Sequence, residues 1–338
     1  MQCNWEVDDN VLPVLGSVDK PPDAVGDTSS RRPVKVSYLT EQTSHHPPVS
    51  AFFVDCPEKA ITARGFDQLS AKFTGTSVRV AAGAHNLGIF VTLHERDNEQ
   101  YQLTHPAAHL GGFLRGAISS VVRVAGDIKL TPSLSQTGSL NITVTDHCFI
   151  VCPKSKLKII LHYLAEGWLG RTQNKVEGVV FKYNPDADNK TKIKDVAEGD
   201  IVARIEGCWQ DKLYYTLPKS NTKHLLIDLN PLTPVAKQIP PETEQLPNES
   251  RRFWAGVTEA IKAREFSKAT SLKLQLEERQ RDKAAARKAG KEEWQPRFFT
   301  GAVTPAGRPD LTKDGEEALR GLHENVFALK PSEVTGAY

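Results

Sequence analysis

The segment from about Val34 to Leu229 consists of short runs rich in Val, Ile, Thr, Phe and Tyr, separated by Gly, Asn, Asp and Pro. Many of these runs alternate apolar and polar residues, as Leu140–Thr145 does, which is the period-two pattern of a strand with one face in solvent. The runs include Thr76–Ala81, Gly88–His94, Ser139–Thr145, Leu157–His162, Gly178–Tyr183, Ile201–Ile205 and Leu213–Leu217. Because no helical pattern intervenes, the segment predicts an antiparallel sheet that curls into a sandwich or barrel.

The residues after this segment predict helices. Pro231–Asn248 is rich in proline and is expected to form a linker packed along the surface. Ser250–Lys291 is rich in Ala, Lys, Glu, Gln and Leu and lacks proline, which favours helix. We expect a break between two helices at Arg264–Ser267, a helix end at Gly290, and a further short helix near Glu316–Leu322.

Composition excludes several classes of protein. With 39% hydrophobic and 25% charged residues, the chain resembles a soluble globular protein. Its net charge of +2 argues against a nucleic-acid partner, so attraction to anionic partners must be local. No run approaches the ~18 apolar residues of a membrane-spanning helix, and Met1–Asn10 has no apolar core of a signal peptide. The chain has five cysteines, an odd number at scattered positions, which suits a reducing compartment. We therefore predict a cytoplasmic protein.

Two adjacent histidines, His45 and His46, are followed by Pro47 and Pro48. Pro47 fixes its own backbone and favours an extended His46, so the two imidazoles are held on rigid chain. Such a pair is commonly a solvated strand end, but it also suits donors aimed at a ligand. A catalytic base or metal ligand is the weaker interpretation, because adjacent side chains on extended backbone diverge. No serine nucleophile motif, HExxH or paired-cysteine site accompanies them, so we predict no enzyme, no catalytic residue and no metal.

The predicted helical segment carries a second group of charges. Lys273, Glu277 and Arg281 recur at i, i+4 and i+8, which places them on one helix face. A carboxylate between two cations holds both long side chains in a fixed geometry. The pattern is consistent with a surface ladder of ion pairs, which contributes little stability. The alternative is a phosphate clamp, in which Arg281 and Lys273 bind phosphate oxygens and Glu277 orients them, but the spacing alone favours the ladder.

Five segments resemble one known family. Glu41–Pro48 is similar to the E-Q-V-S-H-H-P-P fingerprint of the oxysterol-binding-protein-related lipid-transfer family, with Thr43 in place of the usual Val. Four further segments resemble motifs of the same family in the same order: Gly207–Trp209 (G-x-W), Asn248–Trp254 (E-S-R-x-x-W), Lys273–Arg281 (K-x-x-L-E-E-x-Q-R) and Trp294–Phe299 (W-x-P-R-x-F). The resemblance therefore extends over most of the chain.

The resemblance implies a fold and a site. The fold is mainly β (α+β): a large incomplete antiparallel β-barrel enclosing a lipid tunnel, followed by a helical C-terminal subdomain. We predict the barrel over residues 1–240 and the helices over 241–338, together forming one domain. The headgroup of phosphatidylinositol 4-phosphate is expected at the tunnel mouth, between the pair His45 and His46 and the helical residues Lys273, Glu277 and Arg281. No cofactor is expected other than a lipid ligand.

The implied function is exchange of phosphatidylinositol 4-phosphate for a second lipid, a sterol or phosphatidylserine, between membranes. We expect a monomer that contacts anionic membranes peripherally, at membrane contact sites. The sequence does not distinguish between the two second lipids, nor does it show which membranes are served.

The N-terminus departs from the family pattern. Cys3-Asn4-Trp5 resembles the strand that follows the family's lid helix and its K-P-x-N-P-x-L-G-E segment. A second alignment places Leu12–Ser17 on that segment, without its Lys, Asn and Glu. Both alignments leave the lid absent, so we expect an N-terminally shortened form. This favours an alternative function, a phosphoinositide or sterol sensor or scaffold that does not transport.

Overall fold

The computed structural model describes residues 1–7, 33–75, 77–111, 121–124, 127–130, 141–164, 174–220, 222–292 and 294–326. Within them, 15 strands form one sheet and two form a separate ribbon. The strands of the sheet are β1 (Gln2–Val7), β2 (Val34–His45), β3 (Pro48–Cys56), β4 (Ile61–Asp67), β5 (Leu69–Phe73), β6 (Val78–Ala82), β7 (Ile89–Leu93), β8 (Glu99–Leu103), β9 (Ala107–Gly111), β12 (Asn141–Cys152), β13 (Leu157–Tyr163), β14 (Lys175–Lys182), β15 (Ile201–Cys208), β16 (Lys212–Thr216) and β17 (Lys223–Asp228). The ribbon consists of β10 (Val121–Val124) and β11 (Asp127–Leu130).

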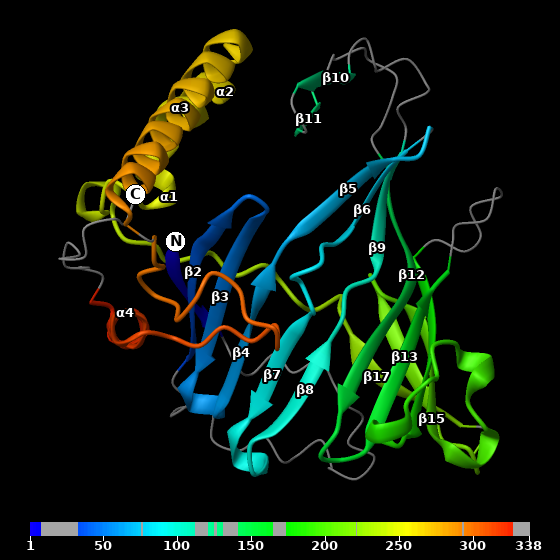
Figure 1. Cartoon of the computed structure of the whole chain (residues 1–338). Helices are drawn as coiled ribbons and strands as arrows, with labels where there is room; N and C mark the ends of the chain where they lie inside the picture. The colour runs from blue at the N-terminus through cyan, green and yellow to red at the C-terminus, as the bar shows by residue number, and fades with distance from the viewer. Residues whose placement is uncertain are drawn as a thin grey trace.

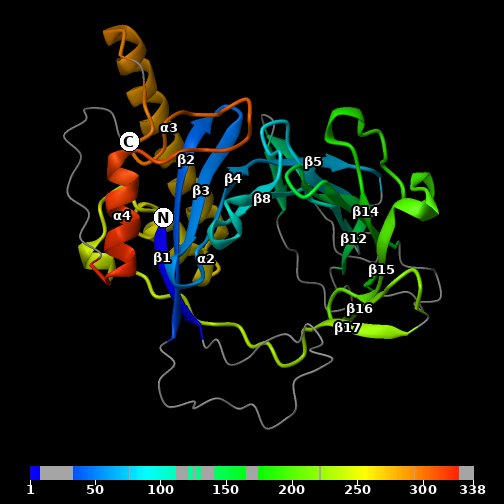
Figure 2. The ribbon, with the colours of Figure 1, turned by 90° about the horizontal axis from the view of Figure 1, so that it is seen from below.

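The large sheet is antiparallel and open. Its main order is β1-β2-β3-β4-β7-β8-β12-β13-β14-β15-β16-β17, so nearly all neighbours follow one another in the chain. A branch leaves this order, in which β5 pairs with β6, β6 with β9, and β9 with the first half of β12. The sheet curls strongly, and β1 and β17 are the two ends of the order (Figure 1, Figure 2). The predicted incomplete antiparallel barrel is therefore confirmed.

The helical segment also follows the prediction. It contains α1 (Ser250–Phe253), α2 (Ala255–Lys262) and α3 (Phe266–Gly290), and α4 (Lys313–His323) comes later. The expected break is present, with Arg264 at a φ of 59° between α2 and α3. Helix α3 ends at Gly290, as predicted, and the next residue adopts a left-handed conformation. The predicted domain boundary at 240/241 lies between β17 and α1, and it stays a prediction.

Two contacts attach the C-terminal residues to the first strands. Helix α4 packs its Ala318, Leu319 and Leu322 against Leu39 of β2, in one buried apolar cluster. The proline-rich segment pairs with β1, because Asn4 and Gln238 exchange backbone hydrogen bonds of 3.0 and 2.8 Å. This edge of the sheet is therefore held by residues that follow the last strand, through side-chain packing of α4 on β2 and backbone pairing of Gln238 with β1.

Candidate functional site

The histidine pair lies at the turn of the β2–β3 hairpin. His45 is the last residue of β2 and pairs with Pro48, and both imidazoles are exposed. The ring centroids are 4.3 Å apart, with the planes inclined at 54°. The prediction that the two side chains diverge is therefore wrong. His46 belongs to the turn and not to an extended strand, and the rings lie side by side where the chain reverses.

Glu41, which precedes the histidine pair, connects the β2–β3 hairpin to the C-terminal segment. The Glu41 carboxylate accepts hydrogen bonds from the backbone N–H groups of Arg297 and Phe298, each 2.8 Å long. Burial raises the pKa of Glu41, and these two backbone donors oppose that shift. Thus two motifs that are about 250 residues apart in the chain are joined by one side chain.

Thr43, the departure from the family fingerprint, has a specific partner. It occupies a β-bulge, because the register shifts between Gln42 and Ser44. Its side chain is fully buried, and its hydroxyl donates a hydrogen bond of 2.6 Å to the carbonyl of Ala302. The usual valine has no such donor. The hydroxyl therefore adds a second connection between the hairpin and the C-terminal segment.

These contacts predict the effect of Glu41→Gln. The amide of glutamine has one acceptor oxygen, so one of the two backbone N–H groups would lose its acceptor. We expect the free energy of unfolding to fall by about 1–3 kcal/mol, as for a buried hydrogen bond to a charged group. Urea denaturation measures this loss, with the exposed Glu95→Gln as control. Equal stability of the two variants would contradict the structural role of Glu41.

The second predicted group lies on α3. Lys273 Nζ is 2.7 Å from Glu277 Oε1, and Arg281 Nη2 is 4.0 Å from Glu277 Oε2. The carboxylate is thus between the two cations on one face, as the spacing predicts. The Arg281 side chain is 66% exposed and that of Glu277 only 22%, so the guanidinium extends furthest into solvent.

The structure brings the five predicted residues together in two groups. His45 and His46 form one at the hairpin turn, and Lys273, Glu277 and Arg281 form the other on α3. In Figure 1, helix α3 lies above the turn end of the β2–β3 hairpin, and its outer part points away from the sheet. Contact of both groups with one headgroup stays a prediction.

One feature that the sequence reasoning missed is an apolar sheet face. Register pairs Phe73 with Val78, Val78 with Leu110, and Leu110 with Ile142, so these side chains form a row across β5, β6, β9 and β12. The next row consists of Ala71, Val80, Ala108 and Val144, and Leu69 with Ala82 extends the same face. Leu69, Phe73 and Ile142 are 66%, 49% and 63% exposed. The face is continuously apolar, exposed at these three residues and buried at Val78, which is 5% exposed.

The opposite face of the same four strands is polar. Lys72 pairs with Arg79, Arg79 with His109, and His109 with Thr143. Such a sheet is amphipathic, and a soluble protein rarely leaves its apolar side uncovered without a function. The period-two alternation of each strand contained this signal, but only the register shows that the apolar residues share one face.

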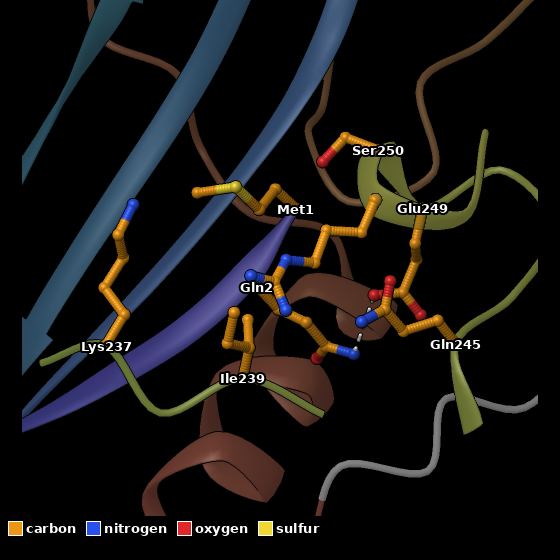
Figure 3. Close-up of a pocket in the computed structure, with 8 residues that line it drawn as sticks. Met1, Gln2, Lys237, Ile239, Gln245, Glu249 and Ser250 are labelled. Carbon is orange, nitrogen blue, oxygen red and sulfur yellow. Dashed lines mark hydrogen bonds between the residues drawn. The ribbon is translucent and has the colours of Figure 1, made fainter. Parts of the chain in front are cut away.

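A small cavity lies between β1, the proline-rich segment and α1 (Figure 3). Its volume is about 100 Å³, and its lining residues are Met1, Gln2, Lys237, Ile239, Gln245, Glu249, Ser250 and Arg251. Gln2 Nε2 donates a hydrogen bond of 3.3 Å to Glu249 Oε2 across it. This volume is equivalent to a few water molecules at ~30 Å³ each, so the cavity is not a lipid site.

The described residues show neither a metal cluster nor a membrane-spanning helix. There, no group of three or more His, Cys, Asp or Glu side chains is arranged to hold a metal ion. No described helix combines the length and apolarity needed to cross a membrane. The five cysteines are free thiols, and Cys148 and Cys152 are both buried on β12.

Solved structures share this fold. The Osh1 ORD domain in complex with ergosterol superposes with a TM-score of 0.57 at 17% identity, covering 89% of this chain and 68% of that one. The Osh3 ORD of Saccharomyces cerevisiae in complex with PI(4)P gives a TM-score of 0.56 at 16% identity, covering 89% and 70%. The open sheet with C-terminal helices is therefore the fold of an ORD domain.

Sequence comparison identifies the family. The family profile described as oxysterol-binding protein matches residues 27–318. Oxysterol-binding protein-like protein 1 of Schizosaccharomyces pombe is 39% identical over 292 residues, which are 86% of this chain and 52% of that protein. Oxysterol-binding protein homolog 7 of Saccharomyces cerevisiae is 30% identical over 306 residues, 86% of this chain and 61% of that protein. The chain belongs to the oxysterol-binding protein family, and it spans about half the length of its first relative.

Proposed function

We propose that this protein binds lipids and exchanges phosphatidylinositol 4-phosphate for a second lipid, a sterol or phosphatidylserine, between membranes. The observation that carries the proposal is the exposed apolar face of β5, β6, β9 and β12. An acyl chain or sterol laid on that face removes apolar surface from water on both partners, at roughly 25 cal/mol per Å². Family membership supports the same ligand class, because one fold neighbour holds ergosterol and another PI(4)P.

The polar end of the ligand would bind the histidine pair and the α3 group. His45 and His46 are exposed donors on a hairpin that Glu41 and Thr43 attach to the C-terminal segment. Arg281 would bind phosphate oxygens in a bidentate geometry, Lys273 would add a point charge, and Glu277 would orient both. Charge-assisted hydrogen bonds of this kind distinguish a phosphorylated headgroup from a plain one. The chain itself would act as a monomer, peripherally, on the cytoplasmic side of membrane contact sites.

A transfer assay tests the exchange. Donor liposomes carry labelled phosphatidylinositol 4-phosphate, acceptor liposomes carry sterol or phosphatidylserine, and movement in both directions is followed. In an exchange, the two lipids occupy one site in turn, so the protein carries one lipid in each direction. Each lipid is therefore expected to accelerate transfer of the other. Binding without transfer would assign the non-transporting sensor function instead. Mass spectrometry of lipids that co-purify with the protein identifies the second ligand.

Arg281→Leu tests the assignment of the α3 group. Loss of one charge-assisted contact is expected to weaken phosphatidylinositol 4-phosphate binding about tenfold or more, since such a contact contributes about 1.5–3 kcal/mol. Arg279→Leu is the matched control, because Arg279 is exposed on the same helix but two positions away, roughly 200° around the axis. Liposome extraction measures both variants. Equal losses would mean that the helix acts only through its general positive charge.

A further inference from the structure

The connection between α2 and α3 carries exposed apolar side chains. Ile261, in the last turn of α2, is 53% exposed, and Phe266, the first residue of α3, is 46% exposed. Other residues make the apolar contact between the two helices: Val257, Ala260 and Ala269 form a buried cluster with Leu272 and Leu276. Ile261 and Phe266 therefore lie outside the contact between the two helices. They flank a tight turn, and that turn is the outer end of an arm projecting from the sheet (Figure 1).

Cationic residues are close to Ile261 and Phe266 in the chain. Lys262, Arg264 and Lys268 lie within seven residues of one another. The acids nearby are Glu259 and Glu265, which pair with Lys262 at 2.9 Å and with Lys268 at 2.7 Å. Both ion pairs are exposed, and such pairs contribute little, so the lysines can exchange these partners for another anion at small cost.

The whole helical hairpin is more positive than the protein. Residues 255–290 contain nine Lys and Arg against five Asp and Glu, a balance of +4, whereas the entire chain has a net charge of +2. The remaining residues therefore sum to −2. Positive charge is concentrated on the arm that carries the exposed apolar tip, which is the combination that binds the surface of an anionic bilayer.

The tip also lies in line with the proposed headgroup site. Phe266 precedes Lys273 by seven residues and Glu277 by eleven, so the three side chains lie within about 40° of one another around α3. The rise from Phe266 to Lys273 is about 10 Å. A bilayer interface in contact with Phe266 would present its lipid headgroups along the helix stripe that carries the cations.

We propose that the α2–α3 turn is a membrane-docking tip. Ile261 and Phe266 enter the interfacial layer of an anionic bilayer, and Lys262, Arg264 and Lys268 contact its anionic headgroups. This inference rests on the proposed lipid exchange for its purpose, since it supplies the contact from which a lipid is extracted. The docking itself requires neither the histidine pair nor a phosphoinositide.

Vesicle cosedimentation of the full chain tests the docking. The vesicles are an equimolar mixture of phosphatidylcholine and phosphatidylserine, with phosphatidylcholine alone as the comparison and no phosphoinositide in either. We expect Ile261→Ser with Phe266→Ser to weaken binding to the anionic vesicles about tenfold, because two half-exposed apolar side chains lose their insertion. Leu232→Ser with Val235→Ser is the matched control, since both residues are 41% exposed and lie outside the helical hairpin. Unchanged binding of the hairpin variant would overturn the proposal.

A second pair of variants separates charge from insertion. Lys262→Glu with Lys268→Glu is expected to remove the preference for phosphatidylserine vesicles, and a preserved preference would contradict the electrostatic half of the proposal. Phe266→Trp is expected to be quenched by lipids brominated in their acyl chains beyond the quenching of the unmodified protein. No added quenching overturns the insertion even if the serine variant is unstable.

Two outcomes distinguish this inference from its alternatives. Light scattering that shows a dimer, lost in Ile261→Ser with Phe266→Ser while vesicle binding persists, would assign the tip to contact between two copies and overturn docking. The docking assay uses vesicles without phosphoinositide, so its result does not depend on the proposed headgroup site. Failure of phosphatidylinositol 4-phosphate exchange with intact vesicle binding would therefore refute the proposed function and leave the docking tip supported.

Discussion

Replacing His45 and His46 together with alanine is expected to reduce extraction of phosphatidylinositol 4-phosphate from liposomes by at least about 100-fold. Each imidazole would contribute a charge-assisted hydrogen bond of about 1.5–3 kcal/mol to the phosphorylated headgroup, and 1.4 kcal/mol is a factor of ten. Both rings are exposed at the hairpin turn, so their loss removes no core packing. The melting temperature of the variant is expected to match that of the unmodified protein.

The chain provides a matched control for this experiment. His147 and His162 are also adjacent rings, with centroids 4.3 Å apart, but they stack across β12 and β13. Their double alanine variant removes the same number of imidazoles from another part of the sheet. Extraction should persist in this control. Equal extraction by all three proteins would refute the headgroup role of the hairpin pair.

Ile142→Lys is expected to abolish lipid loading while leaving the protein soluble. Ile142 is 63% exposed on the apolar face, so the lysine needs no space in a packed core. A bound lipid would have to cover the ammonium group, at a cost of several kcal/mol for an unpaired charge, and would lose about 1.5–3 kcal/mol of apolar contact. Native mass spectrometry or lipid extraction measures the loss, which we expect to exceed 100-fold.

Thr143→Lys is the control for this variant. Thr143 is the next residue of β12, and its side chain lies on the polar face with His109. The same charge is therefore added to the same strand, but on the other side of the sheet. Loading by Thr143→Lys with none by Ile142→Lys would support the apolar face as the lipid-binding wall. Equal loading by both variants would exclude it.

The predicted elements agree with the structure wherever the local pattern is strong. Period-two alternation predicted strands such as Leu157–His162, which is observed as β13 at Leu157–Tyr163. The helix-favouring, proline-free composition predicts α2 and α3, and the residues around Arg264 predict the break between them. Both features depend only on residues that are neighbours in the chain. The order of the motifs was sufficient to predict the family, which the match over residues 27–318 confirms.

The arrangement of the histidines was predicted incorrectly for a local reason. The residue before a proline favours an extended backbone, and on such a backbone the rings of His45 and His46 would point to opposite sides of the strand. The chain instead turns at His46, and the rings lie 4.3 Å apart. A short motif specifies which residues occur in a turn, but the conformation of that turn depends on how its two strands pair.

The sequence by itself determined the antiparallel sheet, the helical hairpin, the family, and the candidate residues of the two charged groups. These depend on periodicity, propensity and short motifs, which act over a few residues. Only the tertiary structure decided that Glu41 accepts hydrogen bonds from Arg297 and Phe298, and that the apolar residues of four strands share one exposed face. The reason is physical: strand register and long-range hydrogen bonds join segments far apart in the chain, and side-chain periodicity within one strand does not specify which residue of another strand lies opposite.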